Sequence, residues 1–501
     1  MKILVPILFL LQGSLAFVPS KIASRSYQHL HASTLEPPSE TITSNNNSNV
    51  TDPTNPLSLM SREPQKSLPT PIVESEDARF HCDASVEKWR KLASQGNDQD
   101  LRDLLQVLRD GLLSPTTSTT LSRAYLTSSG ARTLFFGANG LLSTAIASSS
   151  SGSNMRKAVA TVFRVLEAVK SYEQELQAIE AGLLKYPWDF PVQADNNNKN
   201  NQRGVRVQWD HKQMNPLFAL SESMTLLREA PSILERVAKF QGKPSGGVPA
   251  QQQSTNIEYP KYYLNDFHYQ TDGWLSSASA QKYEMSSETI FIGTQDVMQR
   301  QTILPLRKHF DNTLPASLLE VACGTGRLST FVRDHFPTTD VTLTDLSPFY
   351  LEKAKENDDY WRQYRGKQAM AECTGTSKDP APAQLIQAAA EQLPFADHSF
   401  DAVTCVYLFH ELPGPVRAKA AQEMARVLKP GGMVVFSDSM QEGDRDAFPN
   451  LGAFSNFNEP HYPDYVKNTD VGQLFEQAGL VCGEKYVNSR TKTLSFIKPM
   501  K

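Results

Sequence analysis

Cysteine is scarce in this chain, with only five among 501 residues. The cysteines are widely spaced and none forms a Cys-x-x-Cys pair, so the usual zinc and redox motifs are missing and we predict no bound metal. We expect reduced thiols in a reducing compartment. An excess of positive charge is also missing: the net charge is −4, and we expect no nucleic-acid partner. The five cysteines are Cys82, Cys323, Cys373, Cys405 and Cys482.

No acidic residue precedes Glu36, and the apolar run near the start of the chain is too short to span a bilayer comfortably. Residues 1–16 combine Lys2, that apolar run and a small-residue end, which is the pattern of a signal peptide. A permanent anchor is the weaker alternative, so we expect no transmembrane anchor in the mature chain. The Ser-rich, basic stretch that follows, with Leu-Ala-Phe-Val-Pro at 15–19, resembles the bipartite plastid presequence of algae whose plastids have extra membranes. The resemblance predicts a plastid location, with secretion or an endomembrane lumen as the alternative.

The length of the chain suggests two or three folded units. Residues 17–77 are rich in Pro, Ser, Thr and Asn and are expected to form a transit-like and disordered linker. Residues 78–250 carry apolar residues at helical spacing, which predicts a helical domain of unknown role whose stripes are core rather than a protein-binding face. Residues 251–303 are expected to form an aromatic-rich extension of a C-terminal domain at 304–501.

A glycine-rich turn stands between an apolar strand pattern at 317–323 and an amphipathic helix pattern at 327–335. Such a turn is a ligand cradle, because glycines let the backbone approach the ligand and the free N–H groups at the helix start favour its negative group. A dinucleotide fold expects a third glycine at Ser329, and a phosphate loop expects Lys-Ser/Thr at Arg327 and Leu328. Both alternatives are therefore disfavoured.

The motif that remains, Glu-x-Ala-x-Gly-x-Gly, resembles motif I of class I S-adenosylmethionine-dependent methyltransferases. The resemblance implies that Glu320 helps to place the methionine amino group of the cofactor, and that Ala322 replaces the first glycine of the commonest pattern. Asp345 ends a second strand pattern at 340–345, followed by Leu346 and a helix. A carboxylate there can accept both ribose hydroxyl protons, and a helix cap is the alternative role. The loop residues expected at the S-adenosylmethionine are Glu320, Ala322, Cys323, Gly324, Thr325 and Gly326.

Residues 389–395, Ala-Ala-Glu-Gln-Leu-Pro-Phe, resemble the adenine-binding turn of the same family. The usual acid is Ala389 here, so the backbone of Ala390 and the side chain of Glu391 are the expected adenine contacts. Alternating strands and helices predict an α/β fold: a doubly wound, seven-stranded Rossmann-like methyltransferase sheet with an N-terminal mostly helical domain. The ordered motifs most resemble the branch that contains ubiquinone/menaquinone C-methyltransferases and many small-molecule methyltransferases. The other predicted elements are strands at 399–406, 433–437, 480–487 and 493–498, a helix at 415–428 and a turn at 429–432.

The predicted activity is methyl transfer to a small-molecule acceptor by in-line displacement. Open α/β sheets bind ligands beyond the carboxyl ends of their strands, which directs attention to Tyr407, His410 and Glu411, and to Asp438 after the next strand. His410 is the expected base if a proton must leave, since its unperturbed pKa lies near working pH. Local capping or pairing of His410 and Glu411 is the alternative. A non-catalytic scaffold or partner-binding protein that keeps the fold is the alternative to an enzyme.

Two aromatic stretches could contact ligands. The first could close over a cofactor or a planar substrate, or pack against the catalytic domain, and both roles stay open. The second lies in an insertion at 441–467 and suggests an apolar or planar, quinone-like acceptor, with a structural loop as the alternative. The first stretch contains Tyr259, Tyr262, Tyr263, Phe267, His268, Tyr269, Trp274 and Tyr283, and the second contains Phe448, Phe454, Phe457, His461, Tyr462 and Tyr465.

Overall fold

The structure is a computed structural model. It describes residues 73–74, 119–147, 155–190, 192–195, 204–207, 224, 228, 235, 259–264, 272–311, 313–444 and 459–500. The predicted signal peptide, nearly all of the linker, and the aromatic residues Phe267, His268, Tyr269, Phe448, Phe454 and Phe457 lie outside the described residues.

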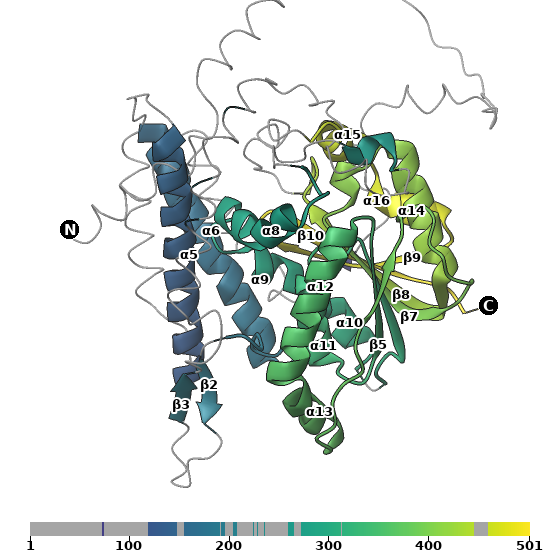
Figure 1. Cartoon of the computed structure of the whole chain (residues 1–501), viewed down its shortest axis with the longest axis horizontal. Helices are drawn as coiled ribbons and strands as arrows, with labels where there is room; N and C mark the ends of the chain where they lie inside the picture. The colour runs from purple at the N-terminus through teal and green to yellow at the C-terminus, as the bar shows by residue number, and fades with distance from the viewer. Residues whose placement is uncertain are drawn as a thin grey trace, which may run out of the picture.

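An eight-stranded mixed sheet lies at the centre of the catalytic domain (Figure 1). Its order is β1-β9-β10-β8-β7-β4-β5-β6, in which β4 to β8 run parallel and β10 runs antiparallel to both of its neighbours. The predicted seven-stranded sheet is confirmed, although the sequence patterns located only six of its strands and not β6. The two-residue β1 adds a parallel edge beside β9. The strands are β1 (Val73–Glu74), β4 (Ser317–Val321), β5 (Asp340–Asp345), β6 (Gln384–Gln387), β7 (Phe400–Val406), β8 (Leu428–Ser439), β9 (Val481–Asn488) and β10 (Thr491–Ile497).

Helices cover both faces of the sheet, as expected for a doubly wound fold. One core cluster joins side chains of α10, α11 and α12 to one face, and a second joins α14, α15 and α16 to the other. None of the described helices is long and apolar enough to cross a bilayer. The helical elements of this part are α8 (Ser277–Ile290), α9 (Gln295–Arg300), α10 (Ile303–His309), α11 (Arg327–His335), α12 (Pro348–Trp361), the π-helical turn η8 (Arg362–Gly366), α13 (Lys367–Thr374), the 3-10 turns η6 (Lys261–Leu264) and η9 (Phe409–Glu411), α14 (Gly414–Val427), α15 (Tyr462–Asn468) and α16 (Val471–Gln477).

Two long helices, α5 (Thr120–Ala147) and α6 (Met155–Glu180), precede the catalytic domain, followed by the hairpin β2 (Val192–Asp195) and β3 (Gly204–Val207). Figure 1 shows the two helices beside α8 and α9, with the hairpin at the lower end of α5. The end of α6 and the segment after it bury side chains in the same core as the sheet, and Trp188 Nε1 donates to Thr330 Oγ1 at 3.1 Å. The described part of the helical half therefore shares a core with the catalytic domain across the predicted boundary near residue 250.

Several predicted bounds are confirmed, notably the helix at 327–335 and the strand at 340–345. The predicted turn at 429–432 is wrong, because these residues belong to β8. Phe400 pairs with Leu428 and Ala402 with Met433, so the extra residues of β8 form a bulge between two paired positions.

The chain leaves β4 toward β5 and β6, then returns to form β7 on the other side of β4. The connections after β4 and after β7 therefore leave the sheet in opposite directions, and a crevice opens between them at the carboxyl ends of the strands. Open α/β sheets bind their ligands at this switch point. The fold thus brings the glycine-rich loop after β4 close to the residues that follow β7.

Candidate functional site

A cavity of about 1390 Å³ opens at the switch point. Its floor is the loop after β4, the end of β5 and the residues after β7, and its walls come from α5, α6, α8, α9 and α12. The volume exceeds the 300 to 1,000 Å³ that is usual for one small ligand. The cavity can therefore hold a cofactor and a second small molecule together.

The glycine-rich loop enters the cavity with three residues in left-handed conformations: Ala322 at φ +55°, Gly324 at +55° and Gly326 at +66°. A Cβ added to Gly324 would meet no atom within 4 Å, so this backbone faces open space. A Cβ on Gly326 would lie 2.9 Å from Ala354 Cβ, so the second glycine allows α12 to pack against the loop. Cys323 and Thr325 complete the loop and also line the cavity.

Glu320, at the end of β4, points a buried carboxylate at the cavity. Its Oε2 has no hydrogen-bond partner among the described residues. Burial, and secondarily the charge of Asp345, raises the pKa of Glu320 to about 8. An unpartnered buried carboxylate is costly and is satisfied by a cationic group, so this position fits a ligand ammonium.

Asp345, at the end of β5, is already held by backbone amides. Gly324 N donates to its Oδ2 at 2.9 Å and Ser347 N to its Oδ1 at 2.8 Å. Burial raises the pKa of Asp345 to about 6 against the opposing effect of these bonds. Asp345 therefore fixes the glycine loop against the start of α12, and its remaining lone pairs can still accept from a ligand hydroxyl.

The predicted adenine contacts lie together on another part of the cavity wall, with Leu346, Ala390 and Glu391 among its lining residues. Tyr262 of η6 donates from its hydroxyl to Glu391 Oε1 at 2.5 Å. Glu391 Oε2 is buried without a hydrogen-bond partner in the described part of the chain. The aromatic segment thus orients a carboxylate that keeps one oxygen available for a ligand N–H.

The described residues of the aromatic stretch at 259–283 both line the cavity and pack against the domain that carries the glycine loop. Tyr262, Tyr263, Trp274 and Tyr283 line the cavity. Trp274 and Tyr283 also pack edge-on against each other and against Tyr350 of α12. The second aromatic group differs: Tyr462 and Tyr465 are buried in the core under α14 and do not line the cavity.

The three predicted catalytic residues separate into two environments. Tyr407 and Glu411 line the cavity, and the Tyr407 hydroxyl lies 2.5 Å from Thr491 Oγ1. His410 does not line it: the ring is buried against Tyr462 and Tyr465 and its Nδ1 lies 2.6 Å from Asp438 Oδ1.

Burial alone would lower the pKa of His410, but the charge and hydrogen bond of Asp438, helped by the neighbouring carboxylates of Glu459 and Glu411, raise it to about 10. A protonated imidazolium has no free lone pair with which to accept a proton. The expected role of His410 as base therefore does not fit its surroundings, and the alternative of local pairing describes its contacts.

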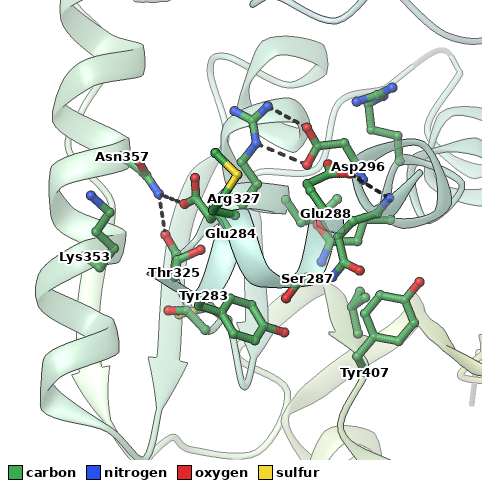
Figure 2. Close-up of a pocket in the computed structure, with 18 of the residues that line it drawn as sticks. Tyr283, Glu284, Ser287, Glu288, Asp296, Thr325, Arg327, Lys353, Asn357 and Tyr407 are labelled. Atoms are coloured by element: carbon green, nitrogen blue, oxygen red, sulfur yellow. Dashed lines mark hydrogen bonds and ion pairs between the residues drawn. The ribbon is translucent and has the colours of Figure 1, made fainter. Parts of the chain in front are cut away.

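Sequence reasoning missed a group of buried ion pairs around Arg327, the residue after the glycine loop. Arg327 bonds Asp189, from the segment after α6, and Asp296 of α9. Arg132 of α5 forms ion pairs with two of these carboxylates. Its Nη2 lies 3.3 Å from Asp296 Oδ2 and 2.7 Å from Glu288 Oε1. Figure 2 shows Arg327 and Asp296 facing each other above α8. No local sequence signal joins these residues, because the pairs connect segments more than 30 positions apart.

The part of the chain that carries the glycine loop is similar in sequence to known methyltransferases. A family model described as a methyltransferase domain matches residues 319–436. A Synechocystis protein named uncharacterized methyltransferase sll0829 is 31% identical over 170 residues, which are 34% of this chain and 69% of the relative.

Two further relatives are named as methyltransferases of quinone-type compounds. The mitochondrial 2-methoxy-6-polyprenyl-1,4-benzoquinol methylase of Caenorhabditis elegans is 26% identical, covering 31% of this chain and 47% of the relative. The demethylmenaquinone methyltransferase of Desulfitobacterium hafniense is 34% identical, covering 24% and 42% respectively. The chain thus spans less than half the length of these two relatives.

Among solved structures, an S-adenosylmethionine-dependent methyltransferase from Aquifex aeolicus aligns with 17% identity over 44% of this chain and 98% of that one, at a TM-score of 0.30. The chain belongs to the class I methyltransferases, whose cofactor is S-adenosylmethionine.

Proposed function

We propose that this protein transfers the methyl group of S-adenosylmethionine to a small-molecule acceptor with an aromatic or quinone-like ring. The observation that carries the proposal is the buried Oε2 of Glu320, which has no partner in the described part of the chain. It lies beside an open glycine loop, inside a cavity large enough for two ligands. The quinone names of two relatives support the acceptor class.

The residues present fit the cofactor. Glu320 would hold the methionine ammonium, and Asp345 the ribose hydroxyls, while Gly324 lets the backbone approach. Ala390 and Glu391 would hold the adenine, with Tyr262 orienting the glutamate. In each case a protein atom with an unfilled lone pair, or a backbone segment facing the cavity, meets a ligand group that it can bind.

The bound cofactor supplies an activated sulfonium methyl, so this chain has to align the acceptor in line with it and exclude water. Tyr283 and Tyr407 line the cavity near the switch point and are placed to confine a planar ring. If the acceptor must lose a proton, Glu411 lines the cavity whereas His410 does not. Glu411 is therefore the better candidate for a base.

Calorimetric titration of the folded full-length chain with S-adenosylhomocysteine tests the proposal. The full chain is required because Arg327, next to the loop, is paired with Asp189 outside the matched domain. We expect saturable binding with one site per chain. Absence of binding by a sample with native circular dichroism would support a scaffold instead.

We further propose delivery to a plastid, on the pattern of residues 1–16 and 17–77 alone. A fluorescent fusion of residues 1–77 in an alga with a multiply bounded plastid tests this. Fluorescence that coincides with chlorophyll is the expected result, and fluorescence confined to the medium would contradict it.

A further inference from the structure

Helices α5 and α6 precede the residues matched by the methyltransferase family, 319–436, yet both line the same cavity as the glycine loop. Because the cavity is too large for one ligand, the space on their side is left for the second one. We name this space the α5 chamber. Its defining residues are Arg132, Phe136, Tyr172, Gln295, Gln299 and Arg300.

The buried positive charges of the α5 chamber are already compensated. Arg132 Nη2 lies 2.7 Å from Glu288 Oε1, and Arg300 Nε lies 2.6 Å from Glu175 Oε1. Burial raises the pKa of Glu288, although the charge of Arg132 acts in the opposite direction. A raised pKa favours the neutral carboxyl group, which attracts a cation less strongly. Three guanidinium groups, of Arg132, Arg300 and Arg327, thus meet four carboxylates, of Glu175, Asp189, Glu288 and Asp296.

This wall has no surplus of positive charge to attract an anion, and its carboxylates would repel an anionic ligand. The carboxylates are likewise occupied by guanidinium groups and, at Glu288, by the backbone N–H groups of Gln295 and Asp296 at 3.2 Å. A cationic ligand therefore also finds no free carboxylate among these four. The charge pattern favours an uncharged ligand.

Two amides of α9 in the same wall have unfilled hydrogen-bonding capacity. The Oε1 atoms of Gln295 and Gln299 are buried and have no partner among the described residues. The two residues lie four positions apart, on one face of the helix. An unsatisfied buried polar atom costs about 1 to 3 kcal/mol, which a ligand hydrogen bond would recover. An amide oxygen accepts hydrogen bonds, so each unfilled Oε1 suits a ligand hydroxyl.

Aromatic and apolar side chains also line this side of the cavity. Phe135 and Phe136 of α5, Tyr172 of α6 and Met285 of α8 line it. Such side chains bind a flat apolar ring, and the two amides bind its polar substituents. We infer that the α5 chamber binds the methyl acceptor, and that this acceptor is an uncharged ring molecule carrying hydroxyl groups. The inference rests on the proposed methyl-transfer function and adds the place, the charge class and the recognising residues.

Arg123 is the residue that would favour an anionic acceptor instead of a neutral one. It is exposed at the mouth of the same cavity, and an acceptor with a carboxylate or phosphate would be drawn to it. Gln299 and Arg123 therefore distinguish a neutral from an anionic acceptor.

The test uses the full-length chain saturated with S-adenosylhomocysteine, titrated by calorimetry under reducing conditions. The probes are a naphthohydroquinone, the same ring with a carboxylate, and the same ring with a trimethylammonium group. We expect the neutral probe to bind at least about tenfold more tightly than either charged one. Gln299→Leu should weaken neutral-probe binding by about tenfold, the effect of one lost hydrogen bond, without changing the affinity for S-adenosylhomocysteine. Arg123→Gln, the matched control, should change neither affinity.

Tightest binding of a charged probe, or a loss of binding in Arg123→Gln with no effect of Gln299→Leu, would overturn the inference. So would failure of all three probes to bind the cofactor-saturated protein. If Gln299→Leu does not fold, Gln295→Leu replaces it with the same expectation. Loss of S-adenosylhomocysteine binding by the wild-type protein would instead contradict the proposed function, so the two failures are distinguishable.

Discussion

Arg327 and Asp296 form a two-pronged ion pair beside the cofactor loop. Arg327 Nη2 lies 2.7 Å from Asp296 Oδ2 and Nε lies 3.2 Å from Oδ1 (Figure 2). Arg327 is the first residue of α11 and follows Gly326 directly. The pair therefore ties the glycine loop to α9, and through Arg132 to α5.

Replacing Asp296 with Asn should destabilise the protein by about 1 to 3 kcal/mol, because it weakens buried charge-assisted hydrogen bonds to two guanidinium groups. Each guanidinium keeps one other carboxylate, Glu288 for Arg132 and Asp189 for Arg327. Urea unfolding monitored by circular dichroism measures the change. Asp359→Asn is the matched control: Asp359 pairs with Lys355 at 2.6 Å on the exposed side of α12, and its loss should cost less than about 0.5 kcal/mol. Equal effects of the two substitutions would contradict a structural role for the Arg327 pair.

The two glycines of the loop should respond differently to alanine. In Gly326→Ala the new Cβ meets Ala354 Cβ at 2.9 Å, and overpacking adds about 1 to 3 kcal/mol to a left-handed strain of about 1 to 2 kcal/mol. In Gly324→Ala only the strain applies, since no atom lies within 4 Å, but the methyl group projects into the open space of the cavity.

We therefore expect Gly326→Ala to lose more stability, and Gly324→Ala to lose at least about tenfold in affinity for S-adenosylhomocysteine at a smaller cost in stability. Thermal unfolding and calorimetry on both variants measure the two quantities. A Gly324→Ala protein with unchanged affinity would show that the cofactor does not approach this backbone.

Glu320 should make cofactor binding depend on pH. Its pKa of about 8 in the free protein means that the carboxyl group is mostly protonated at pH 7, whereas an ammonium beside it favours the carboxylate. Binding should release close to one proton at pH 7. The affinity for S-adenosylhomocysteine should rise between about pH 6 and 8, by up to about tenfold per unit.

Calorimetry in buffers of different ionisation enthalpy counts the protons. Glu320→Gln is the control, since it keeps the size of the side chain and removes the titration. The variant should bind more weakly and with less proton release. An identical pH profile in the two proteins would show that another group titrates on binding.

The sequence predicts best those parts in which neighbouring residues decide the structure. The strand, glycine turn and helix around Gly324 follow from local apolar spacing. The structure confirms the start of the strand and both ends of the helix, while β4 ends at Val321, two residues earlier than predicted. The edge strand β6 was missed because Gln384–Gln387 is short and largely without buried apolar side chains. The contribution of α5 to the cavity was missed because it depends on contacts such as Arg132 with Glu288, which are 156 positions apart.

The same reasoning explains why the surroundings of His410 do not fit the role of base that was expected of it. Its position after β7 was read correctly, but its charge depends on Asp438, 28 positions away on β8. Only the parallel pairing of β7 with β8 brings these two residues together. A pattern confined to one segment therefore finds where a side chain lies along the chain, and not which ionised form it takes.

The pairing of His410 with Asp438 predicts a specific dependence of stability on pH. The pKa of His410 is raised from an unfolded value near 6.5 to about 10, so the pair contributes its full stability below about pH 6.5 and loses it as the pH rises through about 10. His410→Gln leaves the buried carboxylate of Asp438 without a cation and should cost about 3 to 5 kcal/mol at pH 7.

Urea unfolding of wild type and His410→Gln between about pH 7 and 10 should show the difference shrinking as the wild-type imidazolium loses its proton. The affinity of the variant for S-adenosylhomocysteine should stay within about twofold of wild type, since His410 does not line the cavity. A variant as stable as wild type at pH 7 would mean that the ion pair contributes nothing to the fold. His410 would then again be available for the role of base.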